Sequence, residues 1–143
     1  MPLGTQLLIR LLTTLAVAWA APWTLLGLCL GLAALATGGG GRRVGRVLEF
    51  HGGWLNGGLR WAPIAGGASA MTLGHCVIGR TAADLDRCRR HELVHVAQYE
   101  RWGLLFVPAY FACSAWMWLQ GRDPYLDNPF EEEAYRCDSP RRR

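Results

Sequence analysis

The sequence predicts an α+β fold in which an N-terminal transmembrane helix is followed by a small domain of strands and helices. The first observation is an almost wholly apolar run over residues 11–36. The second is the order of the later segments, because strand-like sequences precede helical ones, as in α+β proteins. The third is a long uninterrupted helical segment, residues 82–102, that carries the pattern His-Glu-x-x-His. The 143 residues suffice for one domain beside the apolar helix.

Residues 1–41 are expected to form a membrane anchor that ends in a glycine-rich joint. A helix over Leu11–Ala36 would be about 39 Å long, whereas a bilayer core is about 30 Å thick. One span that tilts, or kinks at Pro22, therefore fits, and two full spans do not. The alternative is a re-entrant hairpin that turns at Ala21-Pro22-Trp23. Gly38–Gly41 would supply the flexible joint.

The same region also resembles a cleavable signal sequence. Arg10 provides a positive charge before the apolar run, and Ala18-Trp19-Ala20 is typical of a cleavage site. The apolar run nevertheless continues to Ala36, which is longer than the apolar part of a signal sequence. We therefore expect a retained anchor.

Charges around the apolar run predict its orientation. Arg10 precedes the run, and Arg42, Arg43 and Arg46 follow it, so the positive-inside tendency predicts a single-pass protein of the bacterial inner membrane with a cytoplasmic domain. Five irregularly spaced cysteines fit a reducing compartment. The tail, residues 141–143, contributes to the net charge of +4 and is either solvated or bound to anionic lipid headgroups. No aromatic and basic pattern indicates nucleic acid as a partner.

Residues 42–143 are expected to form the domain. Val44–Phe50 and Met71–Ile78 have the composition of strands. The glycine pairs Gly52-Gly53 and Gly57-Gly58 indicate turns. The apolar side chains from Trp54 to Trp61 fit either short strands or contact with a membrane surface.

A helix is predicted from Ala82 to Trp102, because Thr81 is a typical N-cap, Asp84 follows at N3 and Gly103 suits a helix end.

Two imidazoles on this helix are predicted to bind one metal ion. His91 and His95 are four residues apart, so they lie on one face. Neutral imidazole is a ligand for Zn²⁺, which lowers the pKa of a bound water. Glu92, on the edge of that face, would take the proton as general base without being a ligand.

Three nearby residues have two interpretations each. Cys88, one turn before His91, either packs as a small apolar side chain or adds a thiolate ligand. Tyr99, one turn after His95, either packs or donates to a developing oxyanion. His75, on the second predicted strand, is either structural or close to the metal.

A second apolar run, Leu104–Leu119, contains Pro108 and five aromatic residues. As a helix it would be about 24 Å long, which is short for a membrane span. It is expected either to pack over the metal-binding helix as a core helix or to lie in the bilayer, where its tryptophans would suit the headgroup level.

The C-terminal segment is expected to provide the third metal ligand. Asn128 is a typical N-cap and Pro129 a typical first helical residue. Glu131 then lies at N3, where it either binds the metal or serves as a capping acid. Glu132 and Glu133 are expected to be solvated.

His91-Glu92-Leu93-Val94-His95, followed on a later helix by Glu131 and Ala134, resembles the zincin metallopeptidases with a glutamate ligand. Membrane-attached members, the HtpX-like heat-shock proteases and the CAAX prenyl proteases, have a comparable Glu-x-x-Ala element. With Asn128-Pro129-Phe130-Glu131 added, the pattern is similar to small uncharacterised bacterial membrane proteins of the same type. The resemblance covers residues 72–135.

The resemblance implies that the two histidines and Glu131 bind zinc and that Glu92 is the general base. It also implies that the strand before the metal-binding helix, Met71–Ile78, lines the substrate cleft as an edge strand. Many of these peptidases have an Asp four residues after the glutamate ligand. Here that position is Tyr135, which would lie near the zinc histidines.

The predicted function is a membrane-anchored, zinc-dependent hydrolase, a metallopeptidase acting on a peptide or protein substrate at the bilayer surface. The alternative is a non-catalytic metal-binding membrane protein, a sensor or assembly partner built on a degenerate zincin fold.

Overall fold

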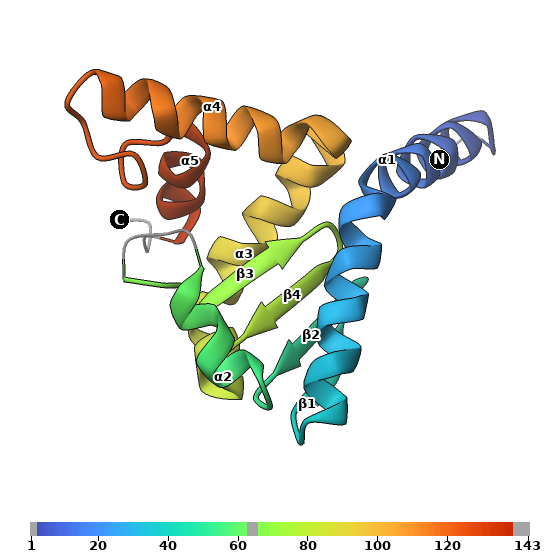
Figure 1. Ribbon diagram of the computed structural model, residues 1–143. Helices are drawn as coiled ribbons and strands as arrows, with labels where there is room; N and C mark the ends of the chain where they lie inside the picture. Colours follow the sequence, from blue (N-terminus) through green and yellow to red (C-terminus); the bar gives the residue numbers. More distant parts are fainter. Residues whose placement is uncertain (1–2, 63–65, 139–143) are drawn as a thin grey trace, which may run out of the picture.

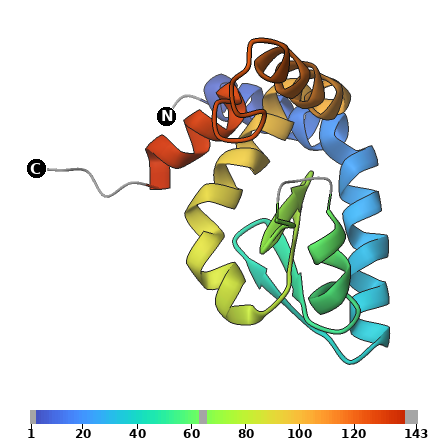
Figure 2. The same cartoon turned by 60° about the vertical axis from the view of Figure 1, so that its left-hand side comes forward.

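A four-stranded sheet lies between two long helices in the computed structural model, which describes residues 3–62 and 66–138. Helix α1 (Leu3–Ala36) lies against one face of the sheet, and α3 (Ala82–Trp102) lies against the other (Figures 1 and 2). The architecture is mixed α+β, as the sequence predicts. The arginine tail, residues 141–143, lies outside the described residues.

The sheet has the order β1-β2-β4-β3. The strands are β1 (Gly40–Val44), β2 (Val47–His51), β3 (Ala70–Leu73) and β4 (Cys76–Gly79). The outer pairs β1–β2 and β3–β4 are antiparallel, and the central pair β2–β4 is parallel. Strand β3 is therefore an edge strand.

Both predicted strands are hairpins instead of single strands. Val44–Phe50 contains a turn at Gly45, and Met71–Ile78 contains a turn at Gly74; the φ angles of these glycines are +60° and +61°. A glycine with positive φ in the first central position makes a two-residue hairpin turn. The β-branched residues on either side hide these turns in the sequence. The glycine-rich joint is also shorter than predicted. Its last two residues, Gly40 and Gly41, belong to β1 and pair with β2.

The segment between the hairpins is helical. Helix α2 (Leu55–Gly58) and the 3₁₀ turn η1 (Leu59–Trp61) replace the short strands that the apolar side chains suggest. Leu55 and Leu59 are buried against the sheet, whereas Trp61 is 89% exposed. The i to i+4 spacing of the two leucines explains why a helical turn buries them better than a strand.

The second half of α1 is part of the domain core. Small residues on one face of this helix are buried: Ala20, Gly27, Gly31 and Ala34. A Cβ at Gly31 would collide with the Phe50 ring. Glycine here lets the helix approach the sheet closely.

Two helical stretches, Leu3–Ala36 and Ala82–Leu119, are long and apolar enough to cross a membrane. A signal sequence or a buried core helix satisfies the same criteria of length and composition. Pro22 lies inside α1, and Figure 1 shows the helix changing direction between its two halves. A proline removes one intrahelical hydrogen bond, which explains a bend at this level.

Helix α3 begins and ends as predicted. Thr81 is the N-cap, and its hydroxyl oxygen accepts a 3.0 Å hydrogen bond from the Asp84 backbone N–H. Gly103 caps the other end with φ +54°. Buried Glu49 of β2 receives hydrogen bonds from Arg89 of α3 and from Arg42 of β1, which fixes the first hairpin to this helix.

The second apolar run is not a core helix. It forms the 3₁₀ turn η2 (Gly103–Leu105) and α4 (Phe106–Leu119). Within α4, whose residues are all described, Phe106 and Met117 are buried, and several large apolar side chains are exposed. The helix touches α3 near its start and then runs across one end of the molecule, above α5 (Figure 1).

We expect Gly31→Ala to destabilise the protein. This is the opposite of the usual effect, because replacing glycine by alanine inside a helix normally stabilises the helix by about 1 kcal/mol. The new methyl group must displace the Phe50 ring, and overpacking of this kind costs about 1–3 kcal/mol. Gly4→Ala is the matched control, since nothing lies within 4 Å of that position. Thermal unfolding in detergent micelles measures both variants. Equal stability of the two would contradict the packing of α1 on the sheet.

Candidate metal centre

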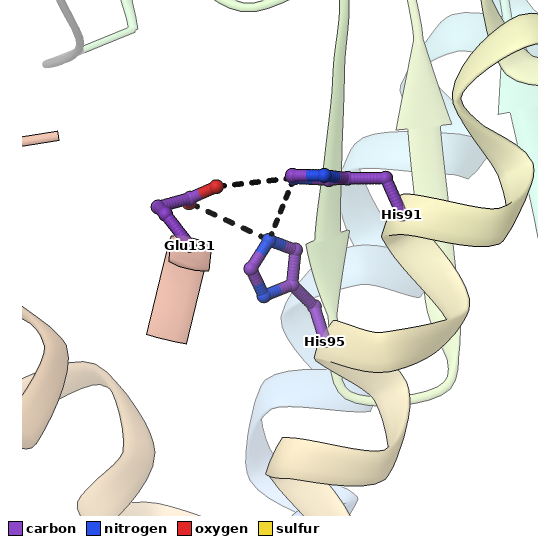
Figure 3. Close-up of side chains that lie close together, drawn as sticks. All are labelled: His91, His95 and Glu131. Carbon is purple, nitrogen blue, oxygen red and sulfur yellow. Dashed lines mark hydrogen bonds and ion pairs between the residues drawn. The ribbon is translucent and has the colours of Figure 1, made fainter. Parts of the chain in front are cut away.

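Three buried side chains converge on one point. His91 and His95 project from α3, and Glu131 projects from α5 (Pro129–Asp138), with their ligand atoms all within 4.8 Å of one another (Figure 3). The two Nε2 atoms are 3.1 Å apart. Glu131 Oε2 lies 3.1 Å from His91 Nε2, and Oε1 lies 3.4 Å from His95 Nε2. The group that the sequence predicts as metal ligands is thus assembled by the fold and could hold an ion.

Contacts of Asn128 and Phe130 hold the N-terminal turn of α5, which carries Glu131, in position. Asn128 caps the helix, because its Oδ1 accepts a hydrogen bond from the Phe130 N–H. The Asn128 amide nitrogen donates to the Tyr110 carbonyl and to Ser114 Oγ on α4. The Phe130 ring packs edge-on against two aromatic rings, those of Trp102 and Phe106. These contacts point the N-terminal turn of α5 at the histidines.

Gln98 determines which nitrogen of His95 carries the proton. Its amide nitrogen donates to the Phe130 carbonyl (3.0 Å) and to Glu133 Oε2 (2.8 Å), so both N–H groups are used. Its Oε1 therefore accepts a hydrogen bond from His95 Nδ1, at 2.8 Å. The lone pair of His95 Nε2 is left facing the centre. Metal-binding histidines generally need such a partner on the other ring nitrogen.

The Glu131 carboxylate is held from one side only. The Tyr110 hydroxyl donates to Oε1 at 2.7 Å. Oε2 is buried and has no partner with hydrogen-bond geometry among the described residues. A buried carboxylate oxygen without a donor is costly, and a bound cation would satisfy it.

The electrostatics of the centre favour a positive charge. Burial by itself raises the pKa of Glu131, but contacts with His91 and His95 outweigh it and hold that pKa below its ordinary value. Burial likewise acts to lower the pKa of His95, and the neighbouring Glu131 carboxylate reverses this to a raised pKa. Two imidazoles and a carboxylate are a suitable ligand set for a divalent transition metal ion.

Glu92 lies beside the ligands but is not one of them. Its Oε2 accepts a 2.7 Å hydrogen bond from the Thr72 hydroxyl on the edge strand β3. Glu92 and the three ligands line the same cavity, whose volume is about 360 Å³. The remaining lining is mostly apolar and aromatic and includes Trp23, Met71, Leu73, Tyr99, Phe106, Val107, Tyr110 and Phe111.

The other predicted site residues lie at different distances from the centre. Tyr99 is buried, lines the cavity and packs against Phe106, with ring centroids 4.4 Å apart. The Tyr135 ring covers His91 edge-on at 4.6 Å. His75 lies in the β3–β4 turn, away from the cavity lining. Its Nε2 is 2.9 Å from a Glu100 carboxylate oxygen, and its backbone N–H donates to Thr24 on α1, so its contacts are structural.

Cys88 does not join the ligand group of the described residues. Burial and the Glu92 charge raise the pKa of its thiol, which disfavours the thiolate that a metal ligand requires. The packing interpretation of Cys88 agrees with these observations.

Sequence reasoning overlooked the residues that hold Glu92 and two of the ligands in place. Gln98 follows His95 by three residues on the same helix face, and this spacing was a usable signal. Thr72 and Tyr110 have no local signal, because they reach the centre from β3 and α4 only after folding. Comparison with known protein families, curated proteins and solved structures finds no match for this chain.

Replacement of one glutamate should remove the metal. We expect Glu131→Gln to lose stoichiometric Zn²⁺, because the variant lacks the anionic ligand between the two imidazoles. Glu132→Gln is the matched control, since Glu132 pairs with Arg136 on the outer side of the same helix. Metal analysis of detergent-purified protein measures both. Zinc retained by the first variant, or lost by the second, would contradict the assignment of the ligand.

Gln98→Met should weaken zinc binding about 10–100-fold while leaving one zinc site, because His95 loses the acceptor that orients it. Glu133→Gln should bind zinc normally, since its amide oxygen can still accept from Gln98. Competition with a fluorescent chelator measures the affinity, and circular dichroism checks the fold. Unchanged affinity in Gln98→Met would show that the tautomer is set by another group.

Proposed function

We propose that the protein is a zinc-dependent hydrolase at a membrane, a metallopeptidase of the zincin type. The observation that carries this proposal is the position of Glu92. Its carboxylate lines the same cavity as His91, His95 and Glu131 without belonging to the ligand group. A hydrolytic site needs this separation between residues that hold the ion and a residue that moves a proton.

Zinc bound by the three side chains would polarise a scissile carbonyl and make a water acidic at neutral pH. Glu92 would accept the proton of the attacking water and later donate it to the leaving amine. Thr72 supports this role because its hydroxyl holds Glu92 Oε2 in place. The other oxygen, Oε1, then remains available for the proton.

The edge strand supports a peptide as the substrate. Residues Ala70, Met71, Thr72 and Leu73 make up β3, lie at the end of the sheet and line the cavity. An extended peptide can add to such an edge through main-chain hydrogen bonds. The apolar lining of the cavity favours a substrate with apolar side chains beside the cleaved bond.

Membrane attachment rests on α1, and the cytoplasmic orientation remains a proposal. Two of the three arginines that predict it are paired with acids: Arg42 with Glu49 and Asp86, and Arg46 with Glu100. Arg43 Nε donates to the Gly45 carbonyl. The orientation can be measured with a reporter fused to the C-terminus.

Glu92→Gln should retain zinc and lose hydrolysis by roughly 10²–10⁴-fold, because only the proton-transfer group is replaced. Zinc-loaded protein in detergent micelles, incubated with a library of quenched fluorescent peptides, measures the activity. Metal content is measured on the same sample. Glu132→Gln serves as the control and should cleave at the wild-type rate.

Two results would contradict the peptidase proposal. One is cleavage by Glu92→Gln at the wild-type rate. The other is wild-type protein with stoichiometric zinc that cleaves no peptide in the library. The second result would favour the non-catalytic alternative, a metal-binding sensor or assembly partner.

A further inference from the structure

The outer side of η2 and α4 is as apolar as the side that packs on the domain. No charged residue occurs between Arg101 and Arg122. One side of α4 contributes Phe106 and Tyr110 to the aromatic cluster around Phe130. The opposite side exposes large apolar side chains: Leu105 (57%), Phe111 (50%), Trp116 (59%), Trp118 (68%) and Leu119 (69%). A helix on a water-facing surface would carry polar residues there.

This apolar surface continues into the exposed N-terminal half of α1. Residues 3–19 of α1 are largely exposed, and most of their large side chains are apolar. The turn η2 meets α1 at Gly103, where a Cβ would collide with the Trp19 indole. Figures 1 and 2 both place α4 and the N-terminal part of α1 at the same end of the molecule, beyond the sheet.

The flanking residues indicate lipid instead of a protein partner. Arg101 and Trp102 precede the apolar segment, and Trp116, Trp118 and Arg122 come at its end. Tryptophan and arginine at the borders of an apolar segment are typical of the headgroup level of a bilayer. The stretch Ala82–Leu119 reaches the length of a membrane span only when α3 is included, and α3 carries charged residues and packs on the sheet. The 14 residues of α4 alone are about 21 Å long, too short to cross a core of about 30 Å. A short apolar helix with tryptophans at its end can be held at the bilayer surface without crossing it.

We propose that η2 and α4 form a second membrane contact, in the headgroup layer of the bilayer to which α1 attaches. The inference uses the membrane attachment proposed above but not the hydrolase activity. It has a consequence for the metal centre, because Val107, Tyr110, Phe111 and Ser114 of α4 line the cavity. The cavity then opens beside lipid, where an apolar segment at the bilayer surface can enter it.

Quenching of tryptophan fluorescence by brominated lipids tests this placement. The full chain is reconstituted into vesicles of phosphatidylcholine and phosphatidylglycerol, with bromine near the headgroup or near the end of the acyl chain. The emission lost on replacing Trp116 and Trp118 by Phe reports on α4. The emission lost on replacing Trp54 and Trp61 by Phe reports on α2 and η1, which lie away from α4 in both views.

The emission from Trp116 and Trp118 should lose most of its intensity with bromine near the headgroup and less with deep bromine. The emission from Trp54 and Trp61 should be unchanged. Each substituted tryptophan pair is at least partly exposed, and thermal unfolding confirms that the variants fold. Unquenched, red-shifted emission from α4 would show a water-covered surface. Unquenched, blue-shifted emission from α4 would show that a protein partner covers this surface. Equal quenching of the α4 pair and of Trp54 and Trp61 would show unspecific insertion. Each of these three results overturns the proposal.

Discussion

Two imidazole nitrogens and a carboxylate meet in a region from which water is largely excluded, and this arrangement needs a positive charge at its centre. Unpaired buried carboxylates cost several kcal/mol. Oε2 of Glu131 has no hydrogen-bond donor of good geometry among the described residues and lies 3.1 Å from His91 Nε2, so the two histidines and a bound cation are the groups that can offset its charge. The second half of the chain brings Glu131 of α5 to the two histidines of α3. A cation would therefore join these helices as well as complete the site.

A second buried glutamate in the same chain, Glu49, has a different environment from Glu131. The Glu49 side chain is buried, with 2% exposure, and its carboxylate accepts hydrogen bonds from Arg42 and Arg89. Two positively charged protein groups thus compensate its charge. These arginines lower its pKa despite its burial. Glu131 is similarly buried, but its neighbours are the imidazoles of His91 and His95, which can lose their charge, and the uncharged hydroxyl group of Tyr110. Incomplete compensation in a cavity is typical of a functional site.

The sequence predicted the parts of the molecule that depend on local rules. Thr81 and Asn128 cap the two helices as expected. Helical spacing predicted that His91 and His95 share one face, and the N3 position predicted Glu131; the three lie together in a group that could hold an ion. The two hairpins were missed because one glycine in each turn is a weak signal beside β-branched residues. The exposure of α4 was not decided, since hydrophobicity does not distinguish a core helix from one that faces lipid. Thr72 and Tyr110 belong to the site through tertiary packing, which leaves no pattern along the chain.

The second half of α1 packs closely on the sheet, so the helix that would attach the protein to a membrane is also needed for the folding of the domain. A protease that removed this helix would leave Phe50, Leu73 and Cys76 facing water, so the released fragment would aggregate instead of diffusing away. Synthesis imposes the same order, because α1 leaves the ribosome before any strand exists. Under the proposed attachment, the helix reaches the bilayer first and the sheet assembles on a partner already in position. Release of the remaining domain by cleavage after α1 is therefore incompatible with a stable fold.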